Sequence, residues 1–148
     1  MKFVLPTLLF IFSFAILGCS NSQEIKKDDE AIPALPKAIL VTDFTPYGGS
    51  APVQINKVSL VKNKMSISIT YSGGCEKHVF QLLGSKMISK SLPPQRSIQL
   101  HHDNKGDSCR EQLTETLVFD VSAFGYEDNE ISLLLKGYRE VIPYIPSK

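Results

Sequence analysis

The sequence predicts an all-β protein, folded as an antiparallel β-sandwich of about six to seven short strands. Apolar and polar side chains alternate with a period of two in several stretches, which is typical of half-buried strands. Clusters of Gly, Pro, Asn and Asp separate these stretches, as turns do. No segment repeats its apolar residues with the longer period of a helix.

The clearest strand covers residues 65–71, where large apolar residues alternate with serines and a threonine. A strand between residues 53 and 61 precedes it, and residues 62–64 form the turn between them. Further alternations predict strands at 78–82, 98–102, 117–121 and 131–135. Turns are expected at 72–74, 92–94, 103–107 and 126–129, one helical turn could form at 122–126, and residues 143–146 fit an edge segment or a frayed tail.

Strands at this spacing favour two packed sheets, in an arrangement like that of immunoglobulin domains, with a small β-barrel as the alternative. The chain has no Trp, so the Cys–Trp–Cys pattern of true immunoglobulin domains is absent. Residues 38–148 are therefore predicted to form a single β-sandwich domain, long enough to bury a core of its own.

Residues 1–18 have the pattern of an export signal. Lys2 supplies a positive charge, residues 3–17 are nearly all apolar, and Gly18 precedes a cysteine. The apolar run is short of the roughly 20 residues that a membrane span needs. The stretch Ile16-Leu17-Gly18-Cys19 resembles the lipobox of bacterial lipoproteins, which implies cleavage before Cys19 and attachment of lipid, such as palmitate, to that residue.

This resemblance implies a protein anchored by lipid in the bacterial cell envelope, in the outer membrane if the cell has one. Residues 19–37 are polar and charged with two prolines, and they predict a disordered tether after the lipidated Cys19. Loss of Lys2 with the signal leaves 15 Lys and Arg against 15 Asp and Glu. Because no basic patch stands out, no nucleic-acid partner is expected. The expected contacts are the membrane, through the lipid, and another envelope protein.

The other two cysteines and all three histidines fall in two short segments, 75–78 and 101–109. Strand alternation places His78 and His102 on the apolar faces of their strands, so both imidazoles are predicted to point inward, near the thiols. Two cysteines exported to an oxidising compartment should pair. The sequence therefore predicts a Cys75–Cys109 disulfide, with the two histidines hydrogen-bonded beside it.

In this interpretation the acids Asp103 and Asp107 shape the turn that precedes Cys109. The alternative is a metal site made of Cys75, His78, His102 and Cys109. Two thiolates and two imidazoles would suit tetrahedral Zn²⁺ or a soft Cu⁺ site, although disulfide formation competes with it outside the cytoplasm.

No catalytic residue and no other cofactor is predicted. A Cys–His pair could in principle form a nucleophile. Here, however, the second cysteine would capture the first, and neither an orienting third group nor an oxyanion motif follows. The glycines before Cys75 fit a turn or bulge better than a nucleophile elbow.

Together with the lipobox, the pattern Gly-Gly-Cys-x₂-His followed by His-Asp-x₃-Asp-x-Cys resembles small uncharacterised bacterial lipoproteins. The resemblance covers the signal and the middle of the folded domain, and it implies no particular activity. The sequence therefore predicts a lipid-anchored, non-enzymatic structural or interaction module of the cell envelope. A zinc- or copper-binding envelope lipoprotein is the alternative.

Overall fold

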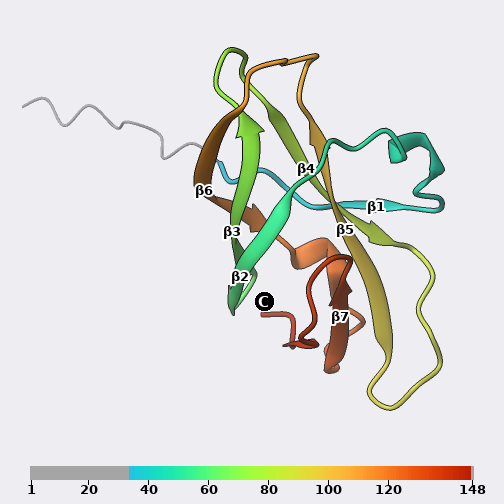
Figure 1. Ribbon diagram of the computed structural model, residues 1–148. Helices are drawn as coiled ribbons and strands as arrows, with labels where there is room; N and C mark the ends of the chain where they lie inside the picture. Colours follow the sequence, from blue (N-terminus) through green and yellow to red (C-terminus); the bar gives the residue numbers. More distant parts are fainter. Residues whose placement is uncertain (1–33, 148) are drawn as a thin grey trace, which may run out of the picture. The chain divides into compact units, whose positions relative to one another are not determined.

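The strands of this protein divide between two sheets. The computed structural model describes residues 34–147, which all belong to one compact unit. Five strands form one sheet in the order β1-β4-β5-β7-β8, and three form the other in the order β2-β3-β6 (Figure 1). The expected signal peptide, Cys19 and all but the last few residues of the expected tether lie outside the described residues.

Within the described residues the chain forms strands and two short 3-10 helices. In chain order they are β1 (Ile39–Val41), η1 (Thr45–Tyr47), β2 (Gln54–Val61), β3 (Lys64–Gly73), β4 (Val79–Ser85), β5 (Gln95–Asp103), β6 (Glu111–Asp120), η2 (Ser122–Phe124), β7 (Ile131–Leu135) and β8 (Ile142–Tyr144). No helix among these residues is both long enough and apolar enough to cross a membrane.

The predicted fold of two β-sheets is confirmed, and the sheets do not close into a barrel. Each strand predicted from alternation is present, and β6 begins at Glu111 rather than near residue 117. Two pairings are parallel, β1 with β4 and β5 with β7, so the five-stranded sheet is mixed. Alternation reports which face a residue occupies and carries no information about the direction of the neighbouring strand.

The core lies between the inner faces of the two sheets. Met65, Ile67 and Ile69 of β3 are fully buried on one side, while the alternate residues of β3 are serines and threonine that face outward. The opposing sheet contributes the other half of the core, including Leu82, Ile98, Leu100, Ile131, Leu133, Leu135 and Tyr144.

The chain joins the fold at Pro36, slightly before the boundary that composition indicates. The carbonyl of Pro36 accepts a hydrogen bond from the N–H of Asp120. The carbonyl of Asp120 in turn accepts a hydrogen bond from the N–H of Ala38. Lys37 lies between them in a parallel bridge with Asp120. The end of the expected tether is thus held against β6.

Four connections carry the chain from one sheet to the other: residues 42–53, 74–78, 104–110 and 121–130. The connections 74–78 and 104–110 lie at the same end of the sheets, as Figure 1 shows above β3 and β5. Residues 50–52 of the first connection reach this end as well, since Ala51 donates to the carbonyl of His102 near the end of β5. Three of the four connections therefore meet in one place.

The fourth connection is held at the other end of β5 by a buried arginine. Arg96 points to the inner side and is only 3% exposed. Its guanidinium donates to the carbonyls of Phe124 at 3.0 Å and Gly125 at 3.4 Å, and also to the carbonyl of Ser85. Burial lowers the pKa of Arg96. The group satisfies backbone acceptors that would otherwise be buried without partners.

We predict that Gly84→Ala lowers the free energy of unfolding by about 1–3 kcal/mol, because a methyl group there would overlap the ring of Phe124 in the packed core. Urea denaturation measures the loss. Gly49→Ala is the matched control, since a Cβ at Gly49 would meet no atom within 4 Å. Equal midpoints for the Gly84→Ala variant and the parent chain would contradict the close packing of Phe124 on β4.

Candidate functional site

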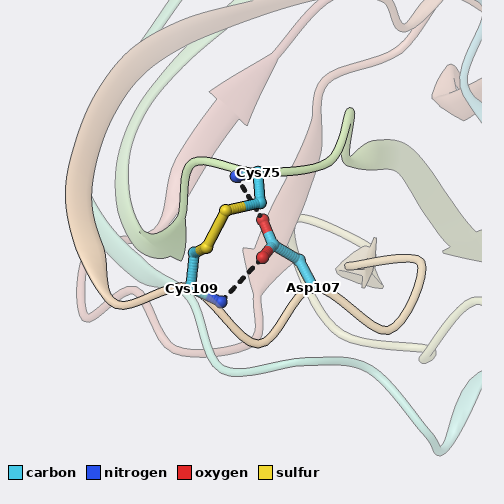
Figure 2. Close-up of side chains that lie close together, drawn as sticks. All are labelled: Cys75, Asp107 and Cys109. Carbon is cyan, nitrogen blue, oxygen red and sulfur yellow. Dashed lines mark hydrogen bonds between the residues drawn. A yellow bond between two sulfur atoms is a disulfide. The ribbon is translucent and has the colours of Figure 1, made fainter.

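The two cysteines of the folded unit form a disulfide between two of the sheet-to-sheet connections. Cys75 lies in 74–78 and Cys109 in 104–110, and their Cα atoms are 5.9 Å apart. Figure 2 shows the bond, with Asp107 beside it. The pairing predicted from the sequence is the one that the structure contains.

Asp107 adds hydrogen bonds to the same junction (Figure 2). Its Oδ1 accepts the N–H of Cys109 at 2.8 Å, within its own connection. Its Oδ2 accepts the N–H groups of Cys75 at 3.0 Å and Glu76 at 3.1 Å, from the facing connection. One carboxylate therefore satisfies backbone donors on both sides of the disulfide.

His78 links this carboxylate to the interior. Its Nε2 lies 3.1 Å from Oδ2 of Asp107, and its Nδ1 lies 2.8 Å from Nε2 of His102. The side chains of His78 and Asp107 are 1% and 0% exposed. Gly73 at the end of β3 makes room for this contact, because a Cβ there would lie 2.7 Å from Nε2 of His78 and 3.1 Å from Oδ2 of Asp107.

His102 connects the third chain segment. Its Nδ1 lies 3.3 Å from the carbonyl of Pro52, and its backbone N–H donates to Oγ of Ser50 at 2.9 Å. The carbonyl of His102 accepts the N–H of Ala51 at 2.7 Å. Asp107, His78 and His102, together with the disulfide, thus join three connections, and we call this set the brace.

Aromatic rings enclose the two imidazoles. Phe80 stacks on His102 with ring centroids 4.5 Å apart, and Tyr71 packs against both histidines at 4.9 and 5.2 Å. His102 is 1% exposed. The inward direction of both histidines, predicted from alternation, is confirmed.

The contacts from Asp107 to Pro52 form a chain with an acceptor at each end. A carboxylate and a carbonyl only accept hydrogen bonds, so each of the three contacts needs an N–H from an imidazole. Two neutral imidazoles carry only two N–H groups. With both rings neutral, two of the three contacts can therefore be hydrogen bonds at any one time.

The surroundings of His102 and Asp107 shift the pKa of each in an identifiable direction. Burial lowers the pKa of His102, the carbonyl of Pro52 acts in the opposite direction, and the neighbouring His78 lowers it further. For Asp107, the N–H of Cys109 lowers the pKa most, burial opposes this, and the N–H groups of Glu76 and Cys75 and the ring of His78 lower it again. The carboxylate is therefore ionised, and it faces His78 directly.

Both acids take part in the turn before Cys109, Asp103 through its carboxylate and Asp107 through its backbone N–H. Lys105 and Gly106 have φ values of 54° and 77°, which two successive central residues adopt in a type I′ turn. Oδ1 of Asp103 accepts the N–H of Lys105 at 2.9 Å. The N–H of Asp107 closes the turn on the carbonyl of Asn104 at 2.9 Å.

The third histidine lies outside the brace. His101 is on the opposite face of β5, where its ring meets the edge of Tyr47 with centroids 5.3 Å apart. Its buried Nδ1 has no hydrogen-bond partner among the described residues.

Metal-ligand atoms also gather at the brace, in a set that differs from the one expected. Among the described residues, ligand atoms of Cys75, Asp107 and Cys109 all lie within 4.8 Å of one another. His78 and His102 instead follow in series behind Asp107. The site of two cysteines and two histidines stays a prediction. The part that sequence reasoning missed is the central role of Asp107, although an Asp two residues before Cys109 is a signal for a side-chain bond to its N–H.

Comparison with known proteins gives a likeness of fold. No protein-family model matches the sequence, and no curated protein matches it. Among solved structures, the chain is similar to a NigD-like immunity protein from Bacteroides caccae, with a TM-score of 0.55 and 18% identity over 77% of this chain and 64% of that one. It is also similar to a protein of unknown function from Bacteroides vulgatus, with a TM-score of 0.50 and 18% identity over 77% of this chain and 57% of that one.

These likenesses show that the two-sheet fold occurs in two proteins from Bacteroides species. At 18% identity they extend to the fold alone. The chain spans less than two thirds of the length of either protein.

We predict that replacing Cys75 and Cys109 together by Ser lowers the free energy of unfolding by about 3–4 kcal/mol, because the bond closes a loop of 34 residues. Urea denaturation of a soluble Cys19→Ser protein measures the loss. Intact mass after alkylation without reductant should show no alkyl group on the parent chain. Two alkyl groups, or unchanged stability in the double variant, would contradict a structural disulfide.

We also predict that Asp107 makes the fold sensitive to acid. Its pKa is lowered in the folded state, so its stabilisation is present above the unfolded carboxyl value of about 3.9 and is lost as the pH falls toward the folded value. Urea midpoints measured from about pH 7 to pH 2 should fall less for Asp107→Asn than for the parent chain. Glu130→Gln removes an exposed acid before β7, and its urea midpoint should fall with pH as much as that of the parent chain. Parallel curves for the parent and Asp107→Asn would rule out this source of acid sensitivity.

Proposed function

We propose that this protein is a lipid-anchored, non-enzymatic interaction module of the bacterial cell envelope. One observation carries the proposal: the side chains capable of chemistry are used to hold the fold together. The sulfurs of Cys75 and Cys109 are bonded to each other. The side chains of His78 and Asp107 are at most 1% exposed, so solvent and substrate do not reach them.

This arrangement is unsuited to nucleophilic catalysis. A cysteine nucleophile must be a free thiolate that a substrate can approach, and a histidine base must exchange a proton with it. Here His78 and His102 bond to each other and to acceptors that are part of the fold. The brace therefore serves to present a rigid domain, and the function lies on the surface of that domain.

The comparisons and the N-terminal sequence support the same role. A solved structure of similar fold is a NigD-like immunity protein, which favours a function in binding. The lipobox at Ile16–Cys19 and the polar segment after it favour a domain held on a tether at a membrane surface. We expect the partner to be another protein of the envelope, and the membrane to be the outer one where two are present.

We predict that the mature chain carries lipid on Cys19 and sediments with membranes. If the lipid on Cys19 is the anchor, Cys19→Ser should move the protein to the soluble fraction. Fractionation and intact mass measure this in cells of the parent organism. Ser20→Ala, next to the modified residue, is the matched control and should stay with the membranes. A Cys19→Ser chain that remains in the membrane fraction would exclude lipid anchoring.

The interaction role is tested in the same cells by photo-cross-linking. A cross-linking residue is placed at exposed positions of either sheet region, such as Gln112 on β6 and Glu130 before β7. A discrete adduct at one of them, retained in the native membrane and lost with Cys19→Ser, supports a membrane-held partner. Failure of every exposed position to form an adduct would argue against an interaction module.

A further inference from the structure

We propose that reduction of the Cys75–Cys109 disulfide opens a zinc site whose ligands are the two thiolates, Asp107 and His78. In this site His102 lies outside the metal shell and orients His78. The proposal goes beyond the interaction role, and it replaces His102 in the ligand set expected from sequence by Asp107.

The ligand atoms are already close together in the oxidised protein. Figure 2 shows Asp107 directed at the disulfide from its own connection. Its carboxylate oxygen and the two sulfurs lie within 4.8 Å of one another. In a tetrahedral zinc shell, thiolate sulfurs about 2.3 Å from the metal lie about 3.8 Å from each other. Opening of the S–S bond therefore brings the sulfurs to metal-binding separation with little movement of the backbone.

His78 is not in the group whose ligand atoms all lie within 4.8 Å of one another, so its side chain must move toward the sulfurs to bind the metal. The proposed fourth ligand is its Nε2. This atom lies 3.1 Å from Oδ2 of Asp107. Two ligands bound to zinc at about 2.0 Å in tetrahedral geometry lie about 3.3 Å apart, so the existing contact already has the length of one edge of the shell. Zinc would take the place that a proton occupies between the carboxylate and the imidazole.

His102 is separated from Asp107 by His78, which lies between them. Its Nε2 faces Nδ1 of His78, and its Nδ1 faces the carbonyl of Pro52. Histidines that bind metal donate their other ring N–H to an acceptor, which fixes the orientation of the ring. Neutral His102 supplies that acceptor to His78, which is the role of a positioning residue.

The donor types favour zinc over the hard cations. Calcium and magnesium take oxygen ligands almost entirely, whereas two thiolates, one imidazole and one carboxylate match the ligands of Zn²⁺. The step is balanced with a thiol reductant. A dithiol gives two electrons and two protons to the disulfide and becomes a disulfide itself. Zinc then displaces both thiol protons and the proton between His78 and Asp107 into solvent.

The test uses the full chain with Cys19→Ser, reduced with a phosphine that is removed before titration under nitrogen. Zn²⁺ alone should bind with a stoichiometry of one, and the oxidised protein should bind none. Co²⁺ in its place should give a sulfur-to-cobalt charge-transfer band and the visible bands of a tetrahedral ion. Absence of binding by the reduced chain would overturn the proposal.

Matched variants separate the proposed ligand set from the one that contains both histidines. His102→Gln should keep the stoichiometry and the charge-transfer band, with affinity reduced about 10- to 100-fold, as for a group that orients a ligand. His78→Gln and Asp107→Asn should each lose more affinity than that and change the visible bands. His101→Gln, outside the brace, should match the parent chain. The proposed ligand set would be overturned if His102→Gln lost zinc affinity as completely as His78→Gln while Asp107→Asn bound zinc normally.

Circular dichroism distinguishes zinc binding by the folded site from zinc binding by an unfolded chain. If reduction keeps the β-sheet signal, the titrations report the folded site. If reduction removes the signal, zinc should restore it in the parent and His101→Gln chains. Binding without a β-sheet signal would count against the proposal.

Discussion

This fold depends most on the hydrogen bonds that the buried carboxylate of Asp107 accepts. Sheet packing is driven by apolar burial, which is strong but not directional. The connections between the sheets bring backbone N–H groups to one end of the sandwich, where they need acceptors. Asp107 accepts from the N–H groups of Cys75, Glu76 and Cys109, and its Oδ2 also faces Nε2 of His78. It thereby fixes how two connections meet, and through the histidines it fixes a third.

The disulfide and the hydrogen-bond chain stabilise the same junction in different ways. On the chain-entropy model, a disulfide acts mainly by restricting the unfolded chain. The Asp107–His78 pair acts in the folded state, where a buried charge is tolerated only with a partner. Each group in this series of hydrogen bonds is the partner of the next. Loss of one group therefore leaves a charge or a polar group without its hydrogen-bond partner. The covalent bond holds the backbone at the spacing this chain of contacts requires.

Much of this architecture follows from local patterns, and the remainder depends on contacts between distant segments. The alternation around Met65, Ile67 and Ile69 sufficed to place β3 and its buried face, and the same rule turned His78 and His102 inward. Alternation predicts neither the order of the strands nor which of them pair in parallel, because it shows which face of a strand a residue occupies and not which strand lies next to it. The short β1 and β8 offer too few residues for a period. The position of Asp107 between two connections exists only once both 74–78 and 104–110 have crossed between the sheets.

Charge balance explains why one junction could serve two redox states. In the oxidised protein, the negative charge of Asp107 is held by three backbone N–H groups and by the ring of His78. Reduction and ionisation of the cysteines would add two negative charges to a site whose histidine and aspartate side chains are almost inaccessible to water. One proton cannot balance three anionic ligands in such surroundings, whereas a divalent cation nearly does. In the proposed reduced state zinc would supply this balance, so the state of the sulfurs would decide whether the junction holds a disulfide or a metal ion.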